Sequence, residues 1–126
     1  MSLDRLIEKI AELKNPTVAG LDPKLSYIPD FIKQDAFRRH GETLEGAAEA
    51  LLQFNRGLID ALCDIVPAVK PQCAYYEMYG WPGLRALAET IRYAKERACL
   101  SLRMESVMIS APRWKPMPPR ILERFL

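Results

Sequence analysis

The sequence predicts an α/β fold in which parallel strands alternate with helices. Three stretches carry apolar residues at helical spacing, and two short β-prone runs lie between them. Each run ends at a charged residue followed by proline, which is a turn signal. Strands that alternate with helices pair in parallel through right-handed crossovers.

The first helix is expected over residues 2–14, where five apolar residues fall on one face. Ser2 is a candidate N-cap, and Asp4 lies in the first turn. Asn15-Pro16 ends the helix, because the residue before a proline is biased away from helical geometry.

The first strand is expected over residues 17–21, because this run is short, apolar and β-prone. Asp22-Pro23 closes it with a turn. A polar stretch with a short apolar segment at residues 27–32 follows, and we expect a connection there.

A long helix is expected from Leu44 to about Ile65, with Thr43 as its N-cap. Asn55 lies on its apolar stripe, and the simplest explanation is a hydrogen bond to a neighbouring loop. The second strand is expected over residues 66–69 and ends at Lys70-Pro71.

After a tyrosine-rich connection, Pro82 is expected to begin another helix. Its inward positions are expected to be Leu84, Leu87, Ala88 and Ile91. A third strand should follow near residues 100–104. Residues 98–126 instead hold Pro112, Pro116, Pro118 and Pro119 and contain no Gly, Asp or Asn, so we expect an irregular tail.

The bulk composition excludes several classes of protein. Of the 126 residues, 49% are hydrophobic and 27% are charged, which is ordinary for a soluble globular domain. A net charge of +2 is too small to indicate nucleic acid or a membrane as a partner. The start of the chain lacks an apolar signal core, so we expect a cytoplasmic protein.

Metal and cofactor chemistry finds little support in the residue inventory. Cys63, Cys73 and Cys99 are odd in number and far apart, which fits neither a disulfide framework nor a zinc site. His40 is the single histidine, and we interpret it as a surface loop residue. We therefore expect no metal and no cofactor.

Asp22 and Lys70 are the candidate site residues. Each could be only a turn or strand-end residue, because Asp favours turns before proline and a strand-end Lys can extend into solvent. They stand, however, at matching ends of consecutive strands. Ligands bind at the carboxyl ends of parallel strands, so the pair indicates a site for a charged ligand.

Over about residues 1–97 the sequence resembles the bacterial second-type orotidine 5'-phosphate decarboxylases. The segments that carry the resemblance are NPTVAGLDPKLSYIP, TLEGAAEALLQFNRGLIDAL, DIVPAVKPQCAYYEMYGWPGL and TIRYAKER. The resemblance implies a TIM-type (β/α)8 barrel working as a homodimer without a cofactor. It also implies that Asp22 contacts the substrate ribose and that Lys70 is the first member of a Lys-Asp-Lys-Asp array.

The other array members of that family lie in a D-x-K-x-x-D motif on the third strand. Aligned without gaps, these positions hold Met104, Ser106 and Ile109, and none can carry the required charge. Ser106 stands where the resemblance places the proton-donor lysine. We therefore expect residues 1–97 to be an N-terminal barrel fragment of about two strands, and residues 98–126 to be a separate tail.

A shifted reading frame accounts for the departure. Read one base out of frame, each codon consists of the third base of one present codon and the first two bases of the next. Met108 followed by Ile109 then forces GAT, which encodes aspartate, and Met104 followed by Glu105 forces GGA, which encodes glycine. Permitted codons for the other residues complete G-L-P-V-I-A-D-G-K-R-N-D from position 98, which contains the missing motif. We therefore expect negligible decarboxylase activity and a tendency to aggregate, because two strands leave edges unpaired.

Two alternatives remain open at this stage. A different phosphosugar-barrel lyase or synthase shares the D-x-K-x-x-D layout, although GLDP and VKPQ favour orotidine 5'-phosphate. A non-enzymatic interaction domain could instead use the basic tail around Trp114 to bind a partner.

Overall fold

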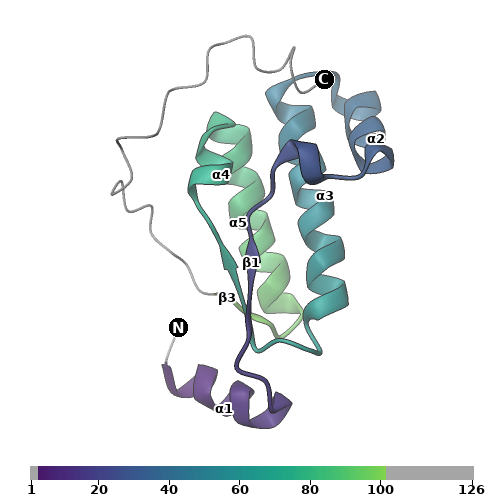
Figure 1. Ribbon diagram of the computed structural model, residues 1–126. Coiled ribbons are helices and arrows are strands. Elements are labelled where there is room, and N and C mark those ends of the chain that lie inside the picture. Colours follow the sequence, from purple (N-terminus) through teal and green to yellow (C-terminus); the bar gives the residue numbers. More distant parts are fainter. Residues whose placement is uncertain (1–2, 102–126) are drawn as a thin grey trace.

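The computed structural model describes residues 3–101, in which helices pack on a parallel sheet (Figure 1). The strands lie in the order β1-β2-β3. Their bounds are β1 Val18–Leu21, β2 Ala68–Pro71 and β3 Leu100–Ser101. The predicted α/β class is confirmed. The sheet has one short strand more than the two expected, and β2 begins two residues later than predicted.

Two long helices, α3 (Leu44–Leu62) and α5 (Gly80–Glu96), cover one face of this sheet (Figure 1). The predicted N-cap of α3 is confirmed, because the Thr43 side chain accepts a hydrogen bond from the Gly46 N–H at 3.2 Å. The helix ends three residues before the predicted Ile65. The buried face of α3 includes Leu51, Asn55 and Ile59.

The inward face of α5 differs in part from the prediction. Leu87 is buried and Ile91 packs against the core, as expected, but Leu84 and Ala88 are exposed. The helix begins at Gly80, not at Pro82, and its buried stripe is rotated by one position. The stripe consists of Gly83, Ala86, Leu87, Thr90 and Ala94. Gly83 lies where α5 passes too close to the Tyr76 backbone to leave room for a Cβ atom, which is consistent with this rotation.

The first helix, α1 (Leu3–Leu13), was predicted and lies at the end of the strands opposite α4 (Figure 1). Asn15 joins two connections at that end. Its Nδ2 donates to the Ile65 carbonyl at 2.8 Å, and its Oδ1 accepts from the Thr17 N–H at 3.0 Å. Among residues 3–101, no helix is both long enough and apolar enough to cross a bilayer.

Three short elements were not predicted: η1 (Leu25–Tyr27), α2 (Asp30–His40) and α4 (Ala74–Glu77). The apolar segment at 27–32 therefore leads into a helix. The α2 helix buries only Ala36 fully, so its sequence shows a weak apolar stripe. His40 is exposed as expected, but it is the last residue of α2 and not a loop residue.

The core of the described residues consists of three clusters, each of which includes residues of α3, and the smallest joins Ala48 and Leu52 to Ala86 of α5. The largest gathers around Tyr76 and Leu51 and includes Cys73. A second cluster joins the sheet to the helices, and its buried members are Leu21, Ile59, Val69, Ala94 and Cys99. Cys63 is only half-buried at the edge of this second cluster. The sheet therefore presents Leu21 and Val69 to the helices.

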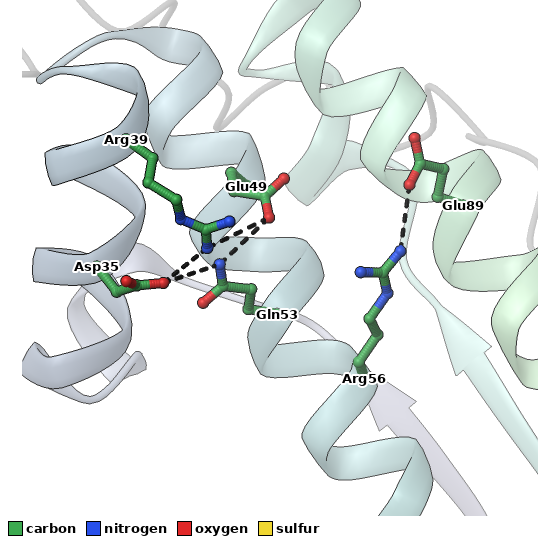
Figure 2. Close-up of polar contacts among 6 residues, drawn as sticks. All are labelled: Asp35, Arg39, Glu49, Gln53, Arg56 and Glu89. Atoms are coloured by element: carbon green, nitrogen blue, oxygen red, sulfur yellow. Dashed lines mark hydrogen bonds and ion pairs between the residues drawn. The ribbon is translucent and has the colours of Figure 1, made fainter.

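Charged side chains join the helices across their outer surfaces (Figure 2). Arg39 of α2 contacts Asp35 at 2.6 Å and Glu49 of α3 at 3.8 Å. Gln53 donates to the same two carboxylates at 3.4 and 3.2 Å. Because the partners come from both helices, this network fixes α2 against α3.

Asp35 makes the stability of the chain depend on pH. Its hydrogen bond to Arg39 holds the pKa of its carboxyl below the ordinary value. A depressed pKa in the folded state adds stability above about pH 4, and this contribution is lost as the pH falls through the folded-state pKa. Urea midpoints measured from pH 6 to 3 should therefore fall less steeply in Asp35→Asn than in the wild type. Parallel curves for the two proteins would contradict this assignment.

Candidate active site

Asp22 and Lys70 lie at the same end of the sheet and on the same face. Lys70 pairs with Gly20 in the parallel register, and Asp22 follows Gly20 by two residues. Side chains two residues apart on an extended chain point to the same side, as do those of paired residues. This face is opposite to the one that Leu21 and Val69 present to the helices. The predicted juxtaposition of the two charges is thus present in the backbone register.

The carboxylate of Asp22 turns back over β1. A Cβ atom built on Gly20 would lie 3.4 Å from Asp22 Oδ2, in ordinary van der Waals contact. Gly20 thus leaves open the space beside the carboxylate. Since neighbouring strands lie about 4.8 Å apart, the carboxylate and the Lys70 side chain emerge from adjacent strands beside this open position. Asp22 is exposed and Lys70 is half-buried, so both are accessible to a ligand.

Two tyrosine rings lie near Lys24, which follows Asp22 by two residues. The Lys24 Nζ lies 5.4 Å from the centre of the Tyr27 ring and 5.8 Å from that of Tyr75. Both distances are within the range of cation–π attraction. The two rings therefore hold the Lys24 ammonium near the point where the chain leaves β1.

A cavity of about 840 Å³ lies elsewhere, between α1 and the connection from α5 to β3. Its walls include Arg5, Lys9, Lys95 and Leu100, but neither Asp22 nor Lys70. It lies beside α1, away from the carboxyl ends of the strands, so we do not assign it to the candidate site. Within residues 3–101, no cluster of three or more Cys, His, Asp or Glu side chains is arranged to hold a metal ion.

Three buried polar side chains support the site from behind. Asn55, Tyr76 and Thr90 are each fully buried. The sequence indicated Asn55 alone, and its partners are side chains of helices α4 and α5 where we expected a loop. Tyr76 and Thr90 were missed because a Tyr-rich connection and a Thr within a helix carry no distinctive pattern.

Burial raises the pKa of Tyr76, the negative charge of Asp22 raises it further, and the hydrogen bond from Asn55 acts in the opposite direction. The Tyr76 hydroxyl is therefore protonated at neutral pH and is available as a hydrogen-bond donor. The third predicted site position, Ser106, lies outside the described residues.

A parallel sheet with two charged residues at its carboxyl edge has the arrangement found in (β/α) barrels, whose ligand sites lie at that edge. No family profile matches the chain. It is 41% identical over 100 residues to an orotidine 5'-phosphate decarboxylase from Clostridium novyi. The aligned region covers 79% of this chain and 32% of the relative. It is 39% identical over 95 residues to the enzyme of the same name from Petrotoga mobilis, spanning 75% of this chain and 30% of the relative.

A crystal structure from Streptomyces avermitilis, assigned to the same enzyme, superposes with a TM-score of 0.57 at 26% identity. The match covers 82% of this chain and 33% of that one. The resemblance predicted from the sequence is therefore confirmed. The chain is related to the orotidine 5'-phosphate decarboxylases, a family of carboxy-lyases, and it spans about a third of the length of these relatives.

Proposed function

We propose that this chain carries the first part of an orotidine 5'-phosphate decarboxylase site and cannot complete the reaction by itself. In this proposal, Asp22 contacts the ribose of orotidine 5'-phosphate, and Lys70 is the first charge of the catalytic array. The observation that carries the proposal is the register that sets Gly20 opposite Lys70, with the Asp22 carboxylate turned over Gly20.

The chemistry of the two residues suits this substrate. A carboxylate accepts hydrogen bonds from ribose hydroxyls, whereas an ammonium group stabilises negative charge. Loss of CO2 from the pyrimidine leaves a carbanion, which a nearby ammonium stabilises electrostatically before a proton arrives. Lys70 supplies one positive charge, but the resemblance assigns the proton transfer to a second lysine. The two carboxylates that keep these lysines ionised belong to the same missing motif.

The missing charges explain why the chain is proposed to be inactive. Met104, Ser106 and Ile109 occupy the positions of the D-x-K-x-x-D motif, and none of them can supply an ammonium or a carboxylate. Without the proton donor, the carbanion has neither its nearest positive charge nor its proton. We propose that a shifted reading frame beginning near codon 98 removed the motif.

The end of α5 supports the proposed shift. Ala98 has φ +56°, and the N–H groups of Ala98 and Cys99 donate to the carbonyls of Lys95 and Ala94 at 3.0 and 2.9 Å. These two bonds form a Schellman motif, whose left-handed residue is usually glycine. An alanine in this conformation costs about 1 kcal/mol. The shifted frame permits glycine here, because an Arg97 codon ending in G followed by GC reads GGC.

Reading the DNA and assaying the purified chain test the proposal together. The other frame over codons 98–126 should encode D-x-K-x-x-D at positions 104, 106 and 109. The chain itself should release no CO2 from orotidine 5'-phosphate above the uncatalysed rate. Decarboxylation by the purified chain that disappears in Lys70→Ala would refute the proposed inactivity. A second frame without the motif would refute the shift.

A further inference from the structure

The buried polar side chains form one continuous path of hydrogen bonds across the helices. Asn55 Nδ2 donates to the Tyr76 hydroxyl at 2.9 Å and to Thr90 Oγ1 at 3.1 Å. The Tyr76 hydroxyl donates to the Leu21 carbonyl at 3.3 Å, and Thr90 Oγ1 donates to the Ala86 carbonyl at 2.7 Å. The path therefore runs from α5 through α3 and α4 to the last residue of β1.

The direction of each bond in this path is determined. Both hydroxyl protons are directed to backbone carbonyls, which can only accept. Asn55 must therefore supply two protons from its amide group, and its side chain has a single orientation that satisfies both hydroxyls. Because these hydrogen bonds have one allowed set of directions, they hold the Leu21 and Ala86 carbonyls in fixed positions.

The end point at Leu21 lies beside both candidate residues in the strand register, because Leu21 follows Gly20, the partner of Lys70. Leu21 directly precedes Asp22, and its carbonyl also accepts from the Gln72 N–H at 3.3 Å. The residue paired with Leu21 is Pro71, and in a parallel pair the carbonyl accepts from the residue after its partner, which is Gln72. The Leu21 carbonyl thus relies on Gln72, two residues after Lys70, and on the Tyr76 hydroxyl.

We propose that Tyr76 is a positioning residue that fixes Asp22 relative to Lys70 by anchoring the Leu21 carbonyl. This inference rests on the proposed function of Asp22 and Lys70. An apolar residue in place of Tyr76 would fill the same space but would leave the end of β1 held by one hydrogen bond. Tyr76 therefore contributes to the register of the two strand ends in addition to the packing of the core.

Amide hydrogen exchange in the full chain tests this role without any ligand. In Tyr76→Phe, exchange of the Gln72 amide should accelerate about tenfold relative to the buried Leu51 amide of α3. This ratio corresponds to about 1.4 kcal/mol of local opening. The matched control is Thr90→Val, which removes a hydroxyl of the same path but leaves the bond from Tyr76 to Leu21. Its ratio should change less than about threefold.

A purely structural role would destabilise the whole chain, so that the Gln72 and Leu51 amides accelerate equally. That outcome would overturn the proposal. If Tyr76→Phe does not fold, the proposal can still be tested in the wild-type chain. The slowly exchanging Tyr76 hydroxyl proton should show a nuclear Overhauser effect to the Asp22 amide proton. Its absence would also overturn the proposal. Decarboxylation is not measured here, so failure of this test is distinct from failure of the proposed function.

Discussion

Reversing the proposed one-base shift at codon 98 is expected to give a protein that decarboxylates orotidine 5'-phosphate, whereas we propose that the present chain does not. The restored third strand would bring aspartates at positions 104 and 109 and a lysine at position 106 beside β2. The proton donor alone contributes roughly 10²–10⁴-fold to a rate. We therefore expect the restored protein to exceed the present chain by at least about 10³-fold in CO2 release.

Two controls separate the effect of the array from a general effect of the changed tail. In the restored protein, Lys70→Ala should lower kcat by roughly 10²–10³-fold, because it removes one charge that stabilises the transition state. In the present chain, Ser106→Lys alone should restore nothing, since its carboxylate partners are still missing. A restored protein without activity, or one indifferent to Lys70→Ala, would contradict the assignment of Lys70.

Gly83→Ala is expected to destabilise the fold more than any other conservative change that we propose. A Cβ at Gly83 would clash with the Tyr76 carbonyl oxygen and would lie 2.9 Å from both the Tyr76 carbonyl carbon and the Tyr79 Cβ. Two of these three neighbours are backbone atoms and cannot rotate away. Overpacking usually costs about 1–3 kcal/mol, and for this clash we expect about 3 kcal/mol in urea denaturation.

Gly57→Ala is the matched control for this prediction. Gly57 lies within α3, and a Cβ built there meets no atom within 4 Å. The same change should therefore stabilise the chain by about 0.5–1 kcal/mol, because alanine favours the helix over glycine. Equal effects at Gly83 and Gly57 would show that α5 does not approach Tyr76 as closely as the structure indicates.

The elements predicted correctly are those whose signals are local. α1 and α3 carry long apolar stripes with a cap or a proline stop, and β1 is bounded by a turn signal. α2 was missed because ion pairs such as Asp30–Lys33 and Asp35–Arg39 support it in place of an apolar stripe. The start of β2 was misplaced because pairing with β1, about 50 residues away, sets the register.

The residues of the candidate site likewise differ in whether a local sequence pattern indicates them. Asp22 and Lys70 could be proposed from the sequence because each stands at the end of a β-prone run and precedes a proline, and both features lie within a few residues. The bond from Tyr76 to the Leu21 carbonyl joins residues 55 positions apart. No local pattern reports such a contact, so the support for the site became visible only in the folded chain.

The unequal burial of the three cysteines has a consequence for thiol chemistry. Burial raises the pKa of Cys99, so little reactive thiolate forms there in the folded chain. Cys73 is also enclosed, whereas Cys63 is partly accessible. An alkylating reagent should therefore modify Cys63 first and reach the other two when the helices separate from the sheet. The chain thus contains its own chemical reporter of unfolding, with no label added.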